Sequence, residues 1–263
     1  MATIKREKIN MNVVIYTNKG HVREHNEDAI FAANNVISGC NMVSPLEFYT
    51  ESKNNCFAVI DGMGGYEGGE KAARIVAASF LENLEKLNMM DAKNKITLVL
   101  NDATQKISHD IKNSPELYAM GAALAGVIFD LEKILIFNCG DCRVYHKKKG
   151  KTLEKLSHDH SIVQELFNKG EIDENEMRFH KQKNIITSCI SAFLESLNIY
   201  FTEISMSEYE KFFICSDGVW ETLSMKKIEK CFCEDNLETA KNLVKELSNM
   251  NEKCRDNISF III

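Results

Sequence analysis

Four aspartates of this chain lie at the ends of short apolar stretches that have the composition of buried strands. Asp61, Asp141 and Asp217 each follow such a stretch, and Asp256 precedes the last one. The strands of one core can bring their ends to the same place, where these carboxylates would raise one another's pKa unless a cation neutralised them. Because oxygen ligands select hard cations, the pattern indicates Mg²⁺ or Mn²⁺ rather than zinc.

The adjacent residues Glu27 and Asp28 add a fifth acidic position, again just before an apolar, strand-like stretch. The simplest alternative for any one of these positions is a turn, since Asp-Gly and Asn-Gly pairs are ordinary turn residues. Five such positions in one chain favour a shared site over five unrelated turns.

A glycine-rich segment, DGMGGYEGGEK at residues 61–71, follows one of these strands. It has no Gly-Lys-Ser/Thr ending and no GxGxxG fingerprint with an acidic partner, so it does not match a nucleotide-binding loop. The glycines favour another role, in which the backbone comes close enough to a metal ion for a carbonyl oxygen to bind it.

Hydrophobic periodicity predicts the elements that must carry these residues. The consecutive strands are typical of antiparallel hairpins, which predicts one α+β domain over residues 1–263, with helix pairs outside a largely antiparallel core. Residues 38–55 are expected to form a polar loop, and residues 171–195 have no readable period. We expect helices at 69–87, 93–112, 160–169, 225–233 and 236–249, and strands at 13–16, 29–32, 56–60, 123–129, 134–138, 143–146, 152–156, 199–204, 212–215 and 257–263.

Composition and charge narrow the classes of function. The 263 residues are 44% hydrophobic and 27% charged, which is globular, and no apolar run reaches the roughly 20 residues of a membrane span. The N-terminus lacks the apolar stretch of a signal peptide, so we expect a cytoplasmic protein without a membrane partner. The net charge of −6 argues against nonspecific nucleic-acid binding, and we interpret the basic run at 146–151 as a hairpin turn.

The nine cysteines are expected to be reduced and mostly buried, because the chain has no export signal. The one CxxC motif, Cys139 to Cys142, ends an apolar strand, whereas a redox CxxC normally opens a helix. Zinc would need a second pair at matched spacing, and the sequence has no second CxxC. The single tryptophan, Trp220, is expected to pack in the core or at its rim.

Five short motifs follow one another along the chain: GHVREHNED at 20–28, DGMGG at 61–65, GDCR at 140–143, CSDG at 215–218 and DN at 256–257. The ordered set resembles the metal-dependent (PPM, type 2C) serine/threonine protein phosphatases in their bacterial form, from about residue 12 to the C-terminus. The resemblance implies an α-β-β-α sandwich, in which two packed antiparallel sheets are flanked by helix pairs. It also implies hydrolysis of phosphoserine and phosphothreonine in proteins by a water activated between two Mn²⁺ or Mg²⁺ ions.

The resemblance further implies a role for each residue at the centre. Arg23 would grip the substrate phosphate, and Asp28 would hold a metal-bound water. Without the resemblance, Arg23 would be read as a surface arginine paired with Glu24 or Glu27. Carried over by position, the metal ligands would be Asp61 for both ions, Asp217 and Asp256 for the first ion, Glu27 and the Gly62 carbonyl for the second, and Asp141 and Glu221 with Asp217 for a third.

The sequence departs from the family pattern in several places. Glu221 stands where relatives carry an aspartate of the third metal site, and its side chain is longer by one methylene group. Met63 stands where some relatives carry a histidine, and Cys142 replaces a serine. The segment near 170–195, a mobile flap in this reading, lacks the Arg and Gly expected around Ser188 and Ser191.

Two other functions stay open. One is a catalytically weak member that senses or scaffolds a phosphorylated partner; the departures motivate it, and the full ligand set argues against it. The other is a phosphatase for small phosphoesters. In the main reading the partner is a phosphorylated protein, the substrate of a serine/threonine kinase, and the chain acts as a monomer.

Overall fold

Two antiparallel β-sheets form the centre of the computed structural model, which describes residues 10–50, 55–65, 68–83, 92–129, 132–192, 197–250 and 254–263. One sheet has the strand order β4 (Leu46–Thr50), β1 (Met11–Asn18), β13 (Ile258–Ile262), β12 (Lys211–Cys215), β8 (Arg143–Lys147) and β9 (Leu153–Lys155). The other has the order β11 (Tyr200–Ser205), β7 (Lys133–Cys139), β6 (Gly121–Phe129), β5 (Asn55–Met63), β2 (Ala29–Ala32) and β3 (Asn35–Ser38), with β10 (Ile190–Ser191) paired to β6. All of these strand pairings are antiparallel, as the sequence predicts.

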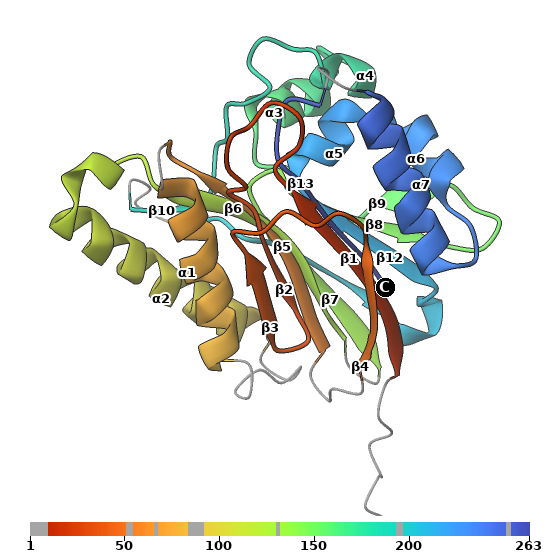
Figure 1. Cartoon of the computed structure of the whole chain (residues 1–263), viewed down its shortest axis with the longest axis horizontal. Helices are drawn as coiled ribbons and strands as arrows, with labels where there is room; N and C mark the ends of the chain where they lie inside the picture. The colour runs from red at the N-terminus through yellow and green to blue at the C-terminus, as the bar shows by residue number, and fades with distance from the viewer. Residues whose placement is uncertain are drawn as a thin grey trace, which may run out of the picture.

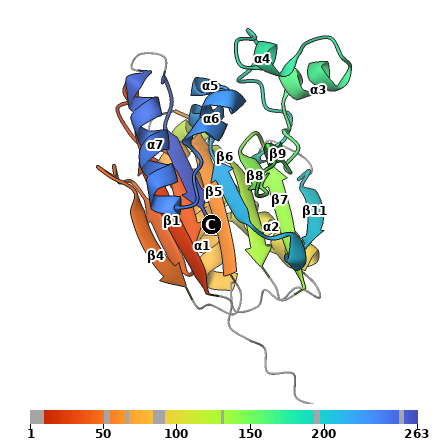
Figure 2. The same ribbon diagram turned by 90° about the vertical axis from the view of Figure 1, so that its right-hand side faces the viewer.

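Helices cover both outer faces of this sandwich (Figure 1). On one face α1 (Gly68–Asn83) packs on β5, and α2 (Ala92–Asn113) packs on α1. On the other face α7 (Asn236–Asn249) packs on β1, with α5 (Asp217–Thr222) and α6 (Met225–Cys231) beside it. Two short helices, α3 (Ile162–Asn168) and α4 (Glu174–Met177), lie beyond the ends of the strands (Figure 2).

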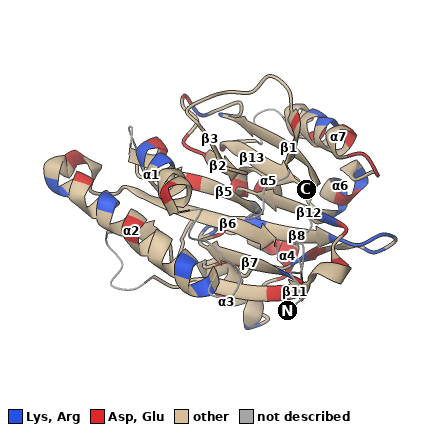
Figure 3. Cartoon of the chain, turned by 90° about the horizontal axis from the view of Figure 1, so that it is seen from below, with Lys and Arg blue, Asp and Glu red and all other residues tan. Residues whose placement is uncertain are grey.

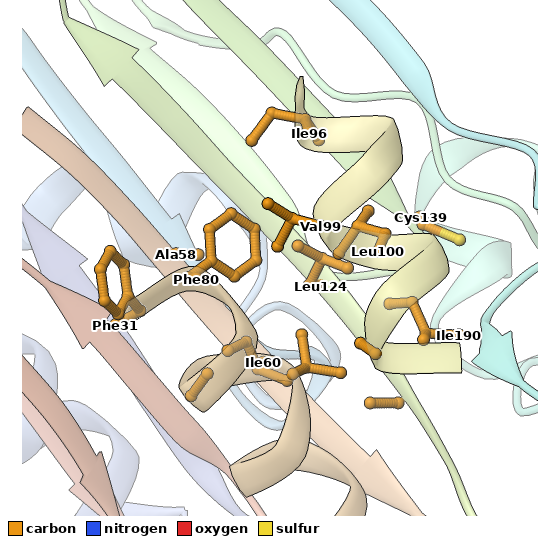
Figure 4. Packing of buried hydrophobic residues seen from close by; sticks show 14 of the residues in the cluster. Phe31, Ala58, Ile60, Phe80, Ile96, Val99, Leu100, Leu124, Cys139 and Ile190 are labelled. Atoms are coloured by element: carbon orange, nitrogen blue, oxygen red, sulfur yellow. The ribbon is translucent and has the colours of Figure 1, made fainter. Parts of the chain in front are cut away.

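The central strands are apolar on both faces because both faces are covered. In β5, Phe57 and Val59 pack between the two sheets, whereas Ala58 and Ile60 pack toward the helices. Phe80 of α1 lies over the helix-facing residues of the sheet (Figure 4). A shift of one residue in the pairing of β5 would exchange the side chains that face the other sheet with those that face the helices. Burial on both faces therefore fixes the strand register, and the register places the strand ends.

The predicted elements agree with the structure except at the sheet edges, at the short helix α5, and in the unassigned segment 171–195, whose described part contains α4 and β10. The polar loop predicted over 38–55 is wrong, because residues 46–50 form the edge strand β4. Its side chains are partly exposed, with Tyr49 67% exposed, so the stretch has no clear apolar alternation. The six-residue helix α5 was not predicted, since it is too short to show a helical period. The predicted helix at 69–87 continues past α1 into residues that lie outside the described ones.

Charged side chains gather on the helices and turns rather than on the strands (Figure 3). The basic run at 146–151 covers the end of β8 and the turn that leads to β9, which confirms the hairpin interpretation. Lys148 in this turn pairs with Glu208 at 2.7 Å. Within the described parts of the chain, no helix combines the length and the apolar character that crossing a bilayer requires.

Candidate active site

The acidic strand ends meet in a cleft of about 1360 Å³ at the end of the sandwich where α5 begins. Both sheets contribute, because Asp61 lies near the end of β5 in one sheet, while Asp217 follows β12 and Asp256 precedes β13 of the other. The residues predicted for the site that line this cleft are Arg23, Glu27, Asp61, Gly62, Asp141, Asp217 and Asp256. The packing of the sandwich thus brings together residues that lie up to 233 positions apart in the sequence.

Glycines allow the backbone segments around the cleft to touch. A Cβ atom added to Gly62 would lie 2.0 Å from the carbonyl oxygen of Gly69 and 2.5 Å from that of Glu27. A Cβ atom added to Gly69 would lie 2.7 Å from the carboxyl carbon of Glu27. Any larger residue would push these segments apart. The close approach holds the Glu27 carboxylate against the N-terminus of α1, where the helix dipole favours negative charge.

Asn257 connects the loop that carries Arg23 and Glu27 to the strand that follows Asp256. Its side-chain amide donates to the carbonyl oxygens of Lys19 (3.1 Å) and His25 (2.9 Å), and its Oδ1 accepts from the Glu27 backbone N–H at 2.8 Å. The sequence motif DN contained this residue, but the sequence offered no role for it. The structure shows that it positions the two halves of the acidic cluster relative to each other.

Asp28 is fully buried behind the cleft and does not line it. Its Oδ2 accepts a hydrogen bond from Ser216 Oγ at 2.9 Å, and Ser216 Oγ accepts from the Ser259 backbone N–H at 3.1 Å. Its Oδ1 is buried and has no hydrogen-bond partner in the part of the chain that the structure describes. Burial raises the pKa of the Asp28 carboxyl to about 7.

The electrostatics of the cluster call for a cation. Burial raises the pKa of Asp61 well above its usual range, and the charge of Asp217 raises it further. Burial likewise raises the pKa of Asp217, with added repulsion from Asp256 and Asp141. Asp217 Oδ1 is also buried, and no described residue forms a hydrogen bond with it. Carboxylates in this condition hold protons or bind a cation, and an all-oxygen set suits Mg²⁺ or Mn²⁺.

The carboxylates line the cleft, but their side chains do not converge on a single position where they would coordinate an ion. Among the described residues, no three acidic, histidine or cysteine side chains stand close enough to hold one ion in this conformation. Asp256 Oδ2 instead accepts from Arg23 Nη2 at 2.8 Å, which raises the pKa of Arg23. The charges, the orphaned oxygens and the oxygen chemistry fit a pair of hard cations, which would draw these side chains together.

The residues predicted for a third ion do not fit one. Asp141 and Asp217 line the cleft, but Glu221 does not. Glu221 Oε2 accepts a hydrogen bond from Lys183 Nζ instead. The carboxylate that would complete the third set is therefore already paired with a cation of the protein.

The described part of the segment without a readable period, residues 171–192, contains α4 and β10 and contributes to one wall of the cleft. Asn184, Ile185 and Ile186 line that wall. The Ile162 backbone N–H donates to the Ile185 carbonyl oxygen at 3.0 Å, and the Thr187 N–H donates to that of His160 at 2.8 Å. These main-chain bonds attach the wall to the start of α3.

A buried cation supports the turn that carries Asp141. Arg143 donates to Asp159 Oδ2 through Nε (2.9 Å) and Nη2 (2.6 Å), and its guanidinium lies 3.5 Å over the Trp220 ring. Trp220 Nε1 donates to the Asp141 carbonyl oxygen at 3.0 Å. The prediction that Trp220 packs in the core or at its rim is confirmed, and its hydrogen bond shows that it also positions Asp141.

The CxxC cysteines belong to different layers of the structure. Cys139 packs in the cluster beneath α1 and α2, whereas Cys142 packs between the sheets. All nine cysteines of the chain are free thiols, and eight of them are buried or partly buried. This agrees with the expectation of reduced, mostly buried cysteines.

We expect Mn²⁺ to raise the thermal unfolding temperature more at pH 8 than at pH 5.5. Burial raises the pKa of Asp28 and of Asp141 from 3.8 to about 7, so between these values the folded, metal-free chain binds more protons than the unfolded chain. Its stability therefore falls as the pH rises through this window, by on the order of 1 kcal/mol per pH unit for each group. A divalent cation replaces the lost protons at high pH.

Calorimetry of EDTA-treated and Mn²⁺-saturated protein at both pH values checks this expectation. The comparison at each pH cancels titrations that are common to both samples, such as those of the histidines. An equal gain in unfolding temperature at the two pH values would contradict the account of the cluster.

Comparison with known proteins extends these observations. Residues 46–257 match the family model described as Protein phosphatase 2C. The chain is 24% identical over 266 residues to the serine/threonine phosphatase stp of Listeria welshimeri, covering 96% of this chain and 95% of that protein.

Solved structures share the fold. Serine/threonine phosphatase Stp1 from Staphylococcus aureus superposes with a TM-score of 0.83 at 22% identity, covering 100% of this chain and 97% of that one. The catalytic domain of the serine/threonine protein phosphatase PstP, solved in complex with 2 manganese ions, superposes with a TM-score of 0.76 at 21% identity, covering 96% and 98%. The α-β-β-α sandwich predicted from the sequence is thereby confirmed.

Proposed function

The chain belongs to the protein phosphatase 2C family, and from that membership we infer that it is an enzyme that hydrolyses phosphoserine and phosphothreonine in proteins. The observation that carries the inference in this molecule is the convergence of Asp61, Asp217 and Asp256 from both sheets on one cleft. An arginine at the mouth of the same cleft supplies a group for the substrate phosphate.

We propose that the cofactor is Mn²⁺ or Mg²⁺, bound as two ions. When bound, such ions would lower the pKa of a water molecule and neutralise the phosphoryl oxygens. Asp28 would keep its place behind them through its hydrogen bond from Ser216. The groups that would hold the ions are Glu27, Asp61, Asp217, Asp256 and the carbonyl oxygen of Gly62.

We propose that Arg23 binds the phosphate of the substrate. Its side chain is 49% exposed at the cleft, and one N–H group is engaged by Asp256. The guanidinium has five N–H donors in a planar fork that matches phosphate oxygens, so donors remain for a ligand.

Replacing Arg23 with alanine is expected to lower kcat/KM by about 10–100-fold, because a hydrogen bond to a charged group contributes about 1.5–3 kcal/mol. Arg23→Lys keeps the charge but loses the fork, so we expect an intermediate loss. Initial rates on a phosphoserine peptide measure both variants. Lys19→Ala, in the same loop but outside the cleft lining, is the matched control. Equal losses in Arg23→Ala and Lys19→Ala would contradict a specific phosphate contact.

The apolar side chains at the edge of the cleft favour a protein substrate over a small phosphoester. Apolar side chains stand at its edge, with Val22 54% and Ile185 45% exposed, and these can contact a peptide on either side of the phosphorylated residue. A sugar phosphate offers no apolar surface to them. We propose that the substrate is a protein phosphorylated by a serine/threonine kinase.

One experiment separates the three functions considered for the chain. The value of kcat/KM for the Mn²⁺-saturated protein is measured on a phosphoserine peptide and on a sugar phosphate. A protein phosphatase has the higher value on the peptide, and a small-phosphoester phosphatase has it on the sugar phosphate. A sensing or scaffolding protein binds the peptide and turns over neither substrate.

We propose a single phosphatase domain over residues 1–263 that acts as a monomer. The segment near 170–195 serves in this proposal as a flap over the cleft, since Asn184, Ile185 and Ile186 already form one of its walls. Size-exclusion chromatography with light scattering tests the monomer, and a mass of twice 29.9 kDa would contradict it.

A further inference from the structure

A lysine of the cleft wall reaches one corner of the acidic cluster. Lys183 Nζ donates to Glu221 Oε2, and the two side chains are 30% and 12% exposed. The other carboxylate oxygen of Glu221, Oε1, is buried and has no hydrogen-bond partner among the described residues. The contact joins residues 38 positions apart, so the fold rather than local sequence creates it.

Glu221 is electrostatically part of the cluster although it does not line the cleft. It lies one turn after Asp217 on α5, so the two side chains share a face of that helix. Burial is the main cause of the raised pKa of Asp217 and of Asp141, and the negative charge of Glu221 adds to both shifts. These three carboxylates form a corner where a positive charge is needed in addition to the two proposed ions.

A second cation attaches the same segment to α5. Arg178 Nη2 donates to the carbonyl oxygens of Glu221 and Thr222, each at 2.9 Å, and its Nε donates to that of Glu221 at 3.1 Å. These carbonyls belong to the last turn of α5, where cations are favourable. Residues 178–183 therefore hold α5 at two points, one on its backbone and one on a side chain.

The length of the Glu221 side chain explains why its carboxylate contacts Lys183 and does not line the cleft. Its extra methylene group, compared with aspartate, carries the carboxylate away from the cleft to the 178–183 segment. A divalent cation shared by Asp141 and Glu221 would meet the ammonium group as a like charge. The pair and a third metal ion are therefore alternatives.

We propose that Lys183 is the built-in counter-cation of the corner formed by Asp141, Asp217 and Glu221, in place of a third metal ion. By the same contact Lys183 positions the wall 184–186 of the cleft. This inference rests on the proposed two-metal phosphatase. It makes the metal stoichiometry of the chain two and couples the wall to the helix that carries Asp217.

Titration of Mn²⁺ into the metal-free protein, followed by calorimetry, tests the stoichiometry. The wild type and Lys183→Arg are expected to bind two ions, because arginine keeps the positive charge. Lys183→Met is expected to bind a third, weaker ion, and so is Glu221→Asp, whose shorter side chain withdraws from Lys183. Lys181→Met, which removes an exposed lysine of the same segment, is the matched control and should bind two.

Hydrogen exchange of the backbone amides 178–187 tests the positioning role and does not depend on metal. Exchange is expected to rise at least tenfold in Lys183→Met, and Lys183→Arg should retain most of the protection. Glu221→Gln keeps the shape of the side chain and gives a second test if Lys183→Met does not fold. Unchanged exchange in both Lys183→Met and Glu221→Gln would overturn the positioning role.

The outcomes separate this inference from the proposed function. Three ions bound by the wild type, or only two bound by both Lys183→Met and Glu221→Asp, would overturn the counter-cation and leave the phosphatase standing. A folded wild type that binds no Mn²⁺ would overturn the proposed function, and this inference with it.

Discussion

Replacing Asp217 with asparagine is expected to lower phosphatase turnover by about 10³-fold or more while the fold is retained. Asp217 stands at the centre of the cluster, where it interacts with Asp61, Asp141 and Asp256. Its loss removes one charge and one oxygen ligand from a site whose cations contribute several kcal/mol of transition-state stabilisation, and each 1.36 kcal/mol changes the rate tenfold.

The same substitution should not destabilise the metal-free protein. Burial already raises the pKa of Asp217 and makes its charged form unfavourable, so a neutral amide of the same shape relieves repulsion. Turnover of a phosphoserine peptide and thermal unfolding after EDTA treatment measure the two effects. Asp102→Asn, the same change on the surface of α2, is the control. Wild-type turnover in Asp217→Asn would show that the assigned ligand set is wrong.

Replacing Arg143 with methionine is expected to give the largest loss of stability, about 3–5 kcal/mol. The substitution leaves the Asp159 carboxylate buried without its two hydrogen bonds from the guanidinium. Lys155 remains at 3.2 Å from Asp159 Oδ1 and offsets only part of the loss. The free energy of unfolding in urea measures the change.

Two further variants identify the cause of that loss. Replacing Asp159 with leucine together with Arg143→Met removes both charges and should recover part of the stability, since an uncompensated buried charge is the main cost. Lys148→Met breaks the exposed pair with Glu208 and should leave the unfolding midpoint nearly unchanged. If Arg143→Met and Lys148→Met lowered the free energy of unfolding equally, burial of the ion pair would not be the cause of the loss.

The fold could be predicted from the sequence where burial imposes a pattern of apolar residues. The strand around Phe57 and Ile60 is apolar on both faces because both are covered, and α1 shows a helical period because only one of its faces is covered. The edge strand β4 was missed because two of its five side chains, Leu46 and Tyr49, are exposed and only Thr50 is buried. Edge strands carry little of the alternation on which sequence interpretation depends.

The acidic centre could be predicted because the sequence places its carboxylates at the ends of recognisable strands. The residues that hold this centre in place could not be predicted. Asn257 bonds to Glu27 from 230 positions away, and Lys183 reaches Glu221 across 38. Asparagine and lysine are common surface residues, so their types carried no signal; only the folded chain identifies their partners.

In the proposed function, this cleft hydrolyses phosphoserine with divalent cations held by its carboxylates. The most direct test is the release of inorganic phosphate from a phosphoserine peptide by the purified protein, measured with Mn²⁺, with Mg²⁺ and with EDTA. We expect the protein to release phosphate with Mn²⁺ or Mg²⁺. EDTA should abolish this release, and added metal should restore it. Release that persists in EDTA, or no release with either metal from a folded sample, would contradict it.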